Sequence, residues 1–244
     1  MYKIYPLLLG KQYRTKGFMT YNIDLDEKLW LSVIAWLVRD EDNAFLVDTG
    51  APLALMNDVR RDLPNEEIAT LEELLKKHGL EPKDIKKLII THLHYDHCGY
   101  LPLFKHADVY VQKSELDFAY NPHPIQKVMY RTNLFEDINF TAYDGDREIL
   151  PGVTALYTPG HSGGNQSVQI ETAKGKAIIS GLCCLMENFK PTGRHKDMEV
   201  LVTGHHLDVR ENYDSLCRIK KQADILIPQH EMSIAELECI PDSL

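Results

Sequence analysis

The sequence lacks a long apolar run and lacks any concentration of basic charge. No stretch approaches the roughly 18 consecutive apolar residues of a membrane-spanning helix, and residues 1–10 hold only an apolar triplet, with no cleavage-site pattern. The 244 residues carry a formal net charge of -9 at pH 7, which argues against binding to nucleic-acid phosphates. We therefore expect neither a membrane nor a nucleic-acid partner.

A complete set of cysteine pairs is also missing, because the cysteine count is odd. The five cysteines are irregularly spaced, at positions 98, 183, 184, 217 and 239. With no export signal recognisable at the start, this pattern predicts reduced thiols and a cytoplasmic location.

No linker-like segment or internal repeat divides the chain. The composition, with 44% hydrophobic and 26% charged residues, is that of an ordinary soluble globular protein, and the length suits one large domain or two small ones. We expect a single domain over residues 1–244.

Strand-like and helix-like segments alternate along the sequence. Expected strands cover residues 2–9, 31–38, 44–47, 86–91, 109–112, 154–157, 167–171, 177–180 and 223–230. Expected helices cover residues 67–78, 114–120 and 213–222. This order predicts mixed sheets covered by helices, whereas residues 121–146 show little periodicity and are expected to form a loop over a site.

The segment T-H-L-H-Y-D-H, residues 91–97, follows an apolar strand and concentrates metal-binding side chains. In an extended segment, residues two apart point the same way, so His92 and His94 can face one point. A turn after His94 would bring Asp96 and His97 towards a second point. Imidazole nitrogen and carboxylate oxygen are ligands of zinc and related metals, so we interpret the segment as a metal site rather than a histidine-rich surface turn.

Two further histidines stand in similar contexts. His161 follows an expected strand in T-P-G-H-S-G-G-N, where glycines let the backbone come close to a ligand, and His230 ends the last expected strand. Either histidine alone is more often structural. Beside the first cluster, we expect both to be ligands.

These motifs carry a resemblance to a known family. T-H-L-H-Y-D-H, the upstream V-D-T-G at residues 47–50, T-P-G-H-S-G-G-N and the late P-Q-H together resemble the metallo-β-lactamase superfamily, most of all its N-acyl homoserine lactonase-like branch. The resemblance covers residues 31–230. It implies an α/β protein with an αββα sandwich, in which two mixed sheets are flanked by helices and the metal site lies at one edge of the sheets.

The resemblance also implies six metal ligands in two sets of three. The sets are His92, His94 and His161 for one ion, and Asp96, His97 and His230 for the other. Asp48 would contact a ligand histidine and orient it, as such carboxylates do; capping of the next turn is the alternative role.

The sequence departs from the family pattern where an aspartate usually bridges both ions. Our alignment puts Gly181 at that position, and no aspartate lies between Asp146 and Asp197. The tyrosine that lactonases of this branch often carry three residues later would here be Cys184. The site thus loses a ligand charge and a possible hydrogen-bond donor to the substrate.

Nearby residues are candidates to compensate. A thiolate of Cys183 or Cys184 could bind metal, because zinc accepts sulfur readily; the alternative is two small buried residues at a strand end. Glu187 and His205 are weaker candidates, each with a structural role as the alternative.

The resemblance implies a metal-dependent hydrolase that cleaves a cyclic ester or amide, or a related acyl bond, with a metal-bound hydroxide. Two divalent ions are expected, zinc first, with Mn²⁺ or Fe²⁺ as alternatives and one site weaker without the bridge. Asp96 would be catalytic, both binding metal and relaying a proton to the leaving group. A glyoxalase II-type thioesterase and a non-catalytic metal- or ligand-binding protein are the alternative functions.

The partner is expected to be a small-molecule substrate. Apolar residues of two expected loops could line its pocket or could form the surface of a homodimer, and the sequence does not separate these readings. They are Phe18, Tyr21, Met129, Tyr130, Leu134 and Phe135.

Overall fold

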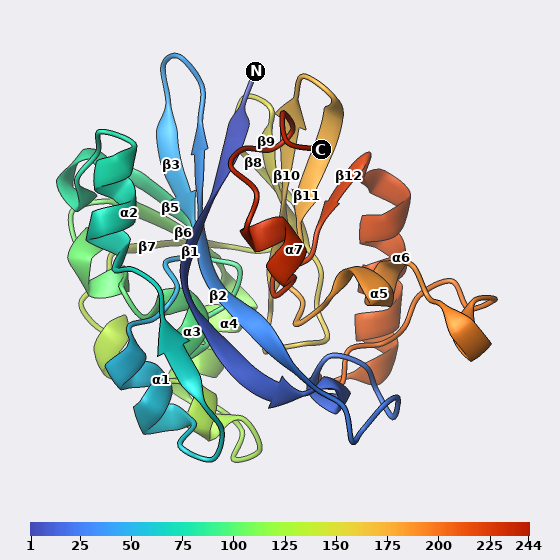
Figure 1. The fold of residues 1–244 in the computed structure, drawn as a ribbon. Coiled ribbons are helices and arrows are strands. Elements are labelled where there is room, and N and C mark those ends of the chain that lie inside the picture. Colours follow the sequence, from blue (N-terminus) through green and yellow to red (C-terminus); the bar gives the residue numbers. More distant parts are fainter.

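The strands form two sheets that pack face to face in the computed structural model, which describes residues 1–244 (Figure 1). The seven-stranded sheet has the order β4 (Asn65–Glu67), β1 (Lys3–Thr15), β2 (Lys28–Arg39), β3 (Ala44–Val47), β5 (Lys87–Ile89), β6 (Asp108–Gln112) and β7 (Phe140–Tyr143). The five-stranded sheet has the order β12 (Ile225–Ile227), β11 (Gly175–Ile179), β10 (Gln166–Thr172), β9 (Val153–Tyr157) and β8 (Arg147–Leu150).

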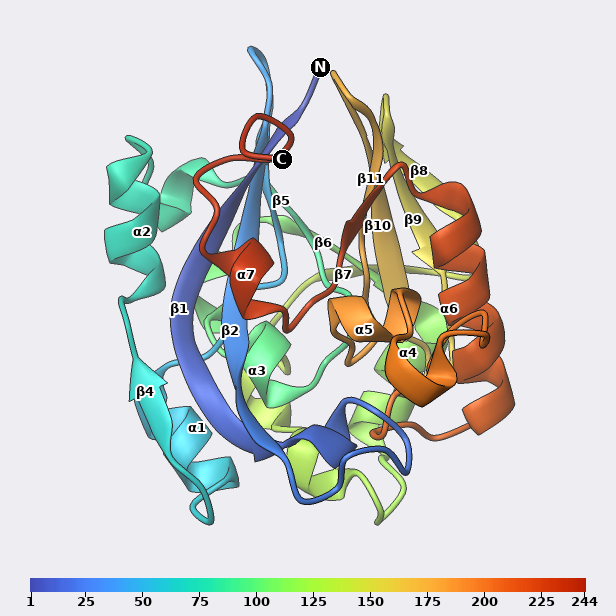
Figure 2. The same cartoon turned by 45° about the vertical axis from the view of Figure 1, so that its right-hand side comes forward.

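Helices cover the outer face of each sheet, as Figure 2 shows most clearly for α2 and α6. On the seven-stranded sheet lie α1 (Leu53–Val59), α2 (Leu71–Lys77), α3 (Tyr95–Cys98) and α4 (Lys113–Tyr120). On the five-stranded sheet lie α5 (Met186–Phe189) and α6 (Val209–Gln222), while α7 (Met232–Ala235) packs into the core between the sheets. The predicted αββα sandwich is confirmed. No helix combines the length and the apolar character needed to cross a membrane.

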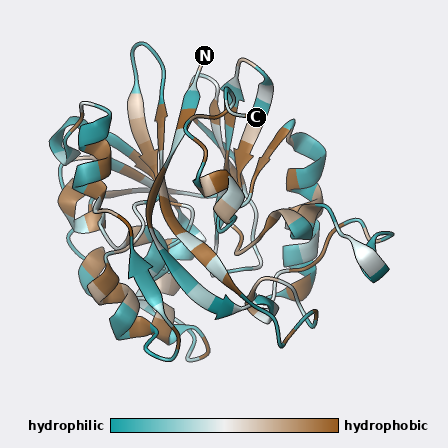
Figure 3. Cartoon of the chain, viewed as in Figure 1, coloured by the Kyte–Doolittle hydropathy of each residue, from teal (hydrophilic) through white to brown (hydrophobic).

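Alternating burial along the central strands produces three hydrophobic layers: one between the two sheets, one under the helices of the seven-stranded sheet and one under the helices of the five-stranded sheet. In β2, Val33 and Ala35 belong to the cluster under the first helices, whereas Ile34 and Trp36 belong to the cluster between the sheets. Successive side chains of a strand point to opposite faces, so β2 is apolar on both. In Figure 3 these central strands are brown, while the outer sides of the helices carry the teal, hydrophilic residues.

The helix expected over residues 67–78 is shorter than predicted. It begins at Leu71, because Thr70 caps it: Thr70 Oγ1 accepts a hydrogen bond from the Glu73 backbone, and Glu73 Oε2 accepts one from the Thr70 backbone at 2.9 Å. Before the cap, β4 pairs with β1. Ile68, which the expected helix would have included, precedes it and is 50% exposed.

The structure also differs from the sequence prediction in segments where polar residues interrupt the alternating pattern of a strand. The first strand continues from residue 9 to residue 15, and its later part buries Gln12 and Arg14 instead of apolar residues. Residues 121–146, expected as a loop, include β7, which pairs with β6. The sequence prediction also omitted the strands β4 and β8 and the short helices α1, α3, α5 and α7.

The strand ends determine where the functional loops meet. Parallel pairing of β3 with β5 puts Asp48 and the 91–97 segment at one edge of the first sheet. In the second sheet β9 and β12 run in the same direction, so His161 and His230 follow their carboxyl ends at one edge. All the predicted ligands therefore come from segments that directly follow strands, with Asp96 and His97 in the short helix α3.

Candidate metal centre

The first predicted ligand set lies together at this edge. One donor atom from each of His92, His94 and His161 lies within 4.8 Å of the other two, and all three side chains are buried. The Nε2 atoms of His92 and His161 are 3.2 Å apart. Two nitrogens bound to one tetrahedral zinc, each about 2.05 Å away, would be about 3.3 Å apart. The three imidazoles therefore have the spacing that one ion requires.

The second predicted set lies beside the first. Donor atoms of Asp96, His97 and His230 also lie within 4.8 Å of one another, with 3.9 Å between His97 Nε2 and Asp96 Oδ1. The His92 and His97 rings, one from each set, have centroids 3.9 Å apart. The two sets are thus adjacent, as a site for two neighbouring ions requires.

Hydrogen bonds orient four of the five histidines so that Nδ1 points away from the other ligands. These Nδ1 atoms donate to Thr91 Oγ1 (His92, 3.1 Å), Asp48 Oδ2 (His97, 2.8 Å), the His205 carbonyl (His161, 2.7 Å) and the Ser32 carbonyl (His230, 2.9 Å). A proton on Nδ1 leaves the lone pair of Nε2 free, which is the arrangement of histidines that bind metal through Nε2.

The remaining polar atoms of the site fit divalent ions. His94 Nε2 and Asp96 Oδ1 are buried and have no hydrogen-bond partner, although such groups are normally satisfied. Burial, followed by repulsion from neighbouring histidines, holds the pKa values of His92, His94 and His161 well below the usual value. These imidazoles are therefore neutral, the form that binds metal.

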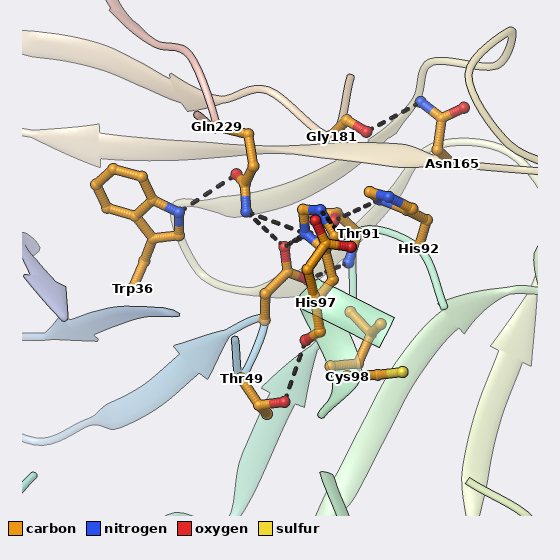
Figure 4. A network of polar contacts seen from close by, with 12 residues as sticks. Trp36, Thr49, Thr91, His92, His97, Cys98, Asn165, Gly181 and Gln229 are labelled. Atoms are coloured by element: carbon orange, nitrogen blue, oxygen red, sulfur yellow. Dashed lines mark hydrogen bonds and ion pairs between the residues drawn. The ribbon is translucent and has the colours of Figure 1, made fainter. Parts of the chain in front are cut away.

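A buried polar network lies behind the second set, and Figure 4 shows Thr91, His97, Gln229 and Trp36 within it. Asp48 joins the first three of these residues through its two carboxylate oxygens. Its Oδ1 accepts a hydrogen bond from the Thr91 backbone at 2.7 Å, and its Oδ2 accepts from Thr91 Oγ1, His97 Nδ1 and Gln229 Nε2. Gln229 is itself held by the indole N–H of Trp36 at 3.3 Å. The carboxylate thereby fixes both the 91–97 loop and the His97 ring.

Glu115, which the sequence interpretation did not select, joins the two histidine loops. This fully buried residue of α4 accepts hydrogen bonds from the Leu93 backbone (2.8 Å) and Tyr130 hydroxyl (3.1 Å) on Oε1, and from Ser162 Oγ (2.6 Å) and the Gly164 backbone (2.9 Å) on Oε2. Burial raises its pKa, which the four donors partly oppose. A lone glutamate in a short amphipathic helix gives no sequence signal for this role.

Gly181 occupies a place with no room for a side chain. A Cβ atom there would lie 1.8 Å from the carbonyl oxygen of Gln166. The Gly181 N–H donates to Ser167 Oγ at 3.0 Å, and its carbonyl accepts from Asn165 Nδ2 at 3.4 Å (Figure 4). With this backbone, a bridging carboxylate cannot be supplied from position 181.

The structure does not bring the two candidate cysteines into either set of ligands. Cys184 packs in the cluster under α6, and its thiol donates to Ser180 Oγ at 3.2 Å. Burial raises its pKa to about 12. The Cys183 thiol lies 3.6 Å from the sulfur of Met19, at the wall of the pocket described next.

A pocket opens onto the two sets of ligands. Phe18 and Met129 line it, which is one of the two roles that the sequence left open for them. His205 also lines the pocket, and its ring centroid lies 5.0 Å from that of His161. Burial lowers the pKa of His205 to about 4. Glu187 instead pairs with Lys16 at 3.0 Å.

The other apolar candidates have different environments. Tyr130, Leu134 and Phe135 are buried in the cluster beneath the first helices, and Tyr21 is 47% exposed. The expected loops therefore contribute two of their six apolar residues to the pocket.

The fold and the paired ligand sets agree with the family comparison. Residues 29–230 match the model of the metallo-beta-lactamase superfamily. The chain belongs to this superfamily and, by its relatives, to the N-acyl homoserine lactonase branch.

Among those relatives are two lactonases of Bacillus. An N-acyl homoserine lactonase of a Bacillus species is 32% identical over 187 residues, which are 72% of this chain and 73% of the relative. Another, from Bacillus cereus, is 29% identical over 237 residues, covering 93% of this chain and 89% of the relative. A crystal structure of a Bacillus thuringiensis AiiA mutant with N-decanoyl-L-homoserine bound at the active site has a TM-score of 0.77, with 27% identity over 95% of this chain and 94% of that chain.

Proposed function

We propose that this protein is a metal-dependent lactonase, in which His92, His94 and His161 hold one divalent ion and Asp96, His97 and His230 hold a second. The observation that carries the proposal is the pair of adjacent three-residue groups, in which four histidines are oriented with Nε2 free and two buried polar atoms lack partners. Membership of a hydrolase branch supports the same reaction class.

The ions would supply two kinds of chemistry when bound: a lowered pKa of bound water and polarisation of the substrate carbonyl. The chain's own residues supply orientation and proton transfer. Asp96 lines the pocket, so its carboxylate is placed to carry a proton to the ring oxygen that leaves when the lactone opens. Asp48 keeps the His97 ring fixed during this step.

We propose zinc as the metal and an N-acyl homoserine lactone or similar lactone as the substrate class. Nitrogen and carboxylate ligands suit zinc, and loss of the bridging carboxylate at Gly181 should make the second ion the weaker one. The lactone is supported by the names of the Bacillus relatives, and by a solved relative with the product N-hexanoyl-L-homoserine at its catalytic metal center, 27% identical to this chain.

We further propose that residues 1–244 form one domain and that the protein is cytoplasmic. The shared hydrophobic cluster between the two sheets supports the first proposal, and five free cysteines support the second. A homodimer stays a prediction, which sedimentation velocity of the purified protein tests.

The test combines ring opening with metal content. Zinc-loaded protein should hydrolyse N-hexanoyl-L-homoserine lactone faster than an acyl thioester of the same chain length. Replacement of His94 or Asp96 with alanine should abolish turnover and reduce bound zinc, whereas His123→Ala, at an exposed position outside both sets, should change neither. Full activity of either ligand variant would overturn the proposal, and faster thioester cleavage would favour the glyoxalase II-type alternative.

A further inference from the structure

Arg14 is a buried cation with no carboxylate partner. The residue is 3% exposed, and its guanidinium donates to Gln12 Oε1 and Asn65 Oδ1, both at 2.6 Å, and to the Tyr13 carbonyl at 2.9 Å. Each of these acceptors is neutral. A buried charge is normally paired, because removing it from water is costly. The guanidinium therefore has no ion-pair partner, and the Asp96 carboxylate of the same pocket acts on it only at longer range.

The contrast with Lys16 shows that this is a local feature. Lys16 lies two residues further along the chain, and its ammonium group pairs with Asp24 (2.8 Å), Glu187 (3.0 Å) and Glu27 (3.3 Å). In a protein of net charge -9, carboxylates are plentiful. Even so, none of them lies within ion-pair distance of Arg14.

A second arginine, Arg60, lies close to Arg14 in the wall of the same pocket. Arg60, at the end of α1, pairs at 3.2 Å with Asp62, whose side chain is 62% exposed, and packs its guanidinium over the Phe18 ring at 5.0 Å. Asn65 links the two residues, because its Oδ1 accepts from Arg14 at 2.6 Å and its Nδ2 donates to the Arg60 carbonyl at 2.8 Å. Burial lowers the pKa of Arg14, Tyr95 opposes this, and repulsion from Arg60 lowers the pKa further. Two like charges held together favour an anion between or beside them.

Both arginines line the pocket that holds the predicted ligands His94, Asp96 and His97. Arg60 donates to Asp62 through Nε and Nη2, so its Nη1 can donate to a further carboxylate. Both Nη atoms of Arg14 already donate to neutral acceptors, so Arg14 would act on an anion mainly through its charge. A substrate anion in this pocket would compensate the buried charge of Arg14 and the repulsion from Arg60, and would place its other end at the metal centre.

We propose that the substrate is an anionic lactone, with a carboxylate on the part remote from the ring that Arg14 and Arg60 bind. This inference rests on the proposed lactonase function and adds the charge of the substrate to it. The neutral N-acyl chains of the lactonase relatives would then be poorer substrates here than an acyl chain that ends in a carboxylate.

A matched pair of probes isolates that charge. N-succinyl-L-homoserine lactone carries a carboxylate at the end of its acyl chain, and its methyl ester differs by one methyl group, which removes the charge. The zinc-loaded protein should show a kcat/KM about tenfold to a hundredfold higher for the acid than for the ester, mainly through KM, which is the range of a charged hydrogen bond. The preference should fall as salt is added.

Neighbouring arginines provide the matched variants. Arg60→Gln should reduce the acid-to-ester ratio about tenfold, and Arg61→Gln should leave it unchanged, because the Arg61 side chain is 78% exposed, pairs with Asp58 and is absent from the pocket wall. Arg14→Lys keeps the charge and should retain part of the preference, whereas Arg14→Gln should lose it. A folded Arg60→Gln protein with an unchanged ratio, or a wild-type protein that prefers the ester, would overturn the inference.

Failure of the proposed function has a different signature. If neither lactone is opened, the lactonase proposal fails, and calorimetric binding of the two intact lactones, the N-succinyl acid and its methyl ester, still tests the anion site. Tighter binding of the acid that disappears in Arg60→Gln would support an anion site, and equal binding of both compounds would overturn it. Hydrolysis of both lactones at equal efficiency would support the proposed lactonase function and overturn the proposed anion site.

Discussion

His97 Nδ1 donates a hydrogen bond to Asp48 Oδ2 across 2.8 Å, and both residues are almost completely buried. The aspartate has a positive φ of 56° directly after β3, a conformation that turns its carboxylate into the polar network. The carboxylates of Asp96 and Asp48 raise the pKa of His97, although burial of the ring opposes this. The contact fixes which nitrogen of His97 faces the metal centre.

Asp48→Asn should weaken the second ion selectively. Asp48 Oδ2 accepts hydrogen bonds from Thr91, His97 and Gln229. An amide NH₂ group in the place of this oxygen is itself a donor, so it cannot hold the His97 ring as the carboxylate does. We expect a loss of about 10- to 100-fold in zinc affinity at the Asp96–His97–His230 set, measured by calorimetric titration. Asp137→Asn, at a side chain 68% exposed, is the control. Unchanged affinity for both ions would contradict this role of Asp48.

Gly181→Asp should destabilise the protein rather than restore a bridging ligand. Even the Cβ of Gly181→Ala would meet the Gln166 carbonyl at 1.8 Å, so the strand end must move. We expect a loss of about 1–3 kcal/mol in the free energy of unfolding in urea for the alanine variant. Gly145→Ala is the control, because its Cβ would meet no atom within 4 Å. The positive φ of 76° is unfavourable for alanine, so this variant should lose about 1 kcal/mol of unfolding free energy. A stable Gly181→Asp protein with tighter zinc binding would show that the backbone adapts.

Glu115→Gln should loosen both histidine loops. The amide keeps one acceptor oxygen, while its NH₂ group faces donors that the carboxylate now satisfies. We expect a loss of about 1–3 kcal/mol in unfolding free energy, the cost of leaving a buried donor unsatisfied, and weaker zinc binding at the His92–His94–His161 set. Glu66→Gln, in a surface pair with Lys11, is the control. The role assigned to Glu115 would be refuted if chemical denaturation of both variants gave wild-type stability.

Lys16→Met should destabilise the protein in a pH-dependent way. It would leave three carboxylates facing one another, at a cost of about 1 kcal/mol near neutral pH after allowing for solvent exposure. Lys16 lowers the pKa of Asp24, so this stabilisation is present above the ordinary value of 3.8 and is lost as the pH falls through the pKa of the folded state. Thermal unfolding from pH 7 to pH 3 should show the variant approaching wild type. Lys113→Met, which removes an exposed pair with Asp117, is the control and should lower the unfolding temperature less at every pH. If the difference between Lys16→Met and wild type stayed constant with pH, the account would be contradicted.

The sequence was sufficient to predict the sandwich and the neighbourhood of the ligands. Apolar strands and their following loops have local signals, and H-x-H-x-D-H has a spacing that few other sites require. The resemblance then related His161 and His230 to the same site, and the structure brings all six side chains into two groups.

Residues that act across long sequence distances could not be predicted in this way. Glu115 and Gln229 look like ordinary polar residues, and only the fold shows that they hold loops from other strands. Arg14 lies in a segment whose buried polar residues obscure the strand pattern. The closed space at Gly181 likewise depends on the neighbouring strand end at Gln166, which no local pattern reveals.

Calorimetric titration of the metal-free protein with zinc, followed by metal analysis of the saturated protein, tests the central claim most directly. We predict two zinc ions per chain bound in two steps of unequal affinity, with the weaker step missing in His230→Ala and the tighter step missing in His92→Ala. A protein that binds one zinc or none at saturation would contradict a dinuclear centre built from these six residues.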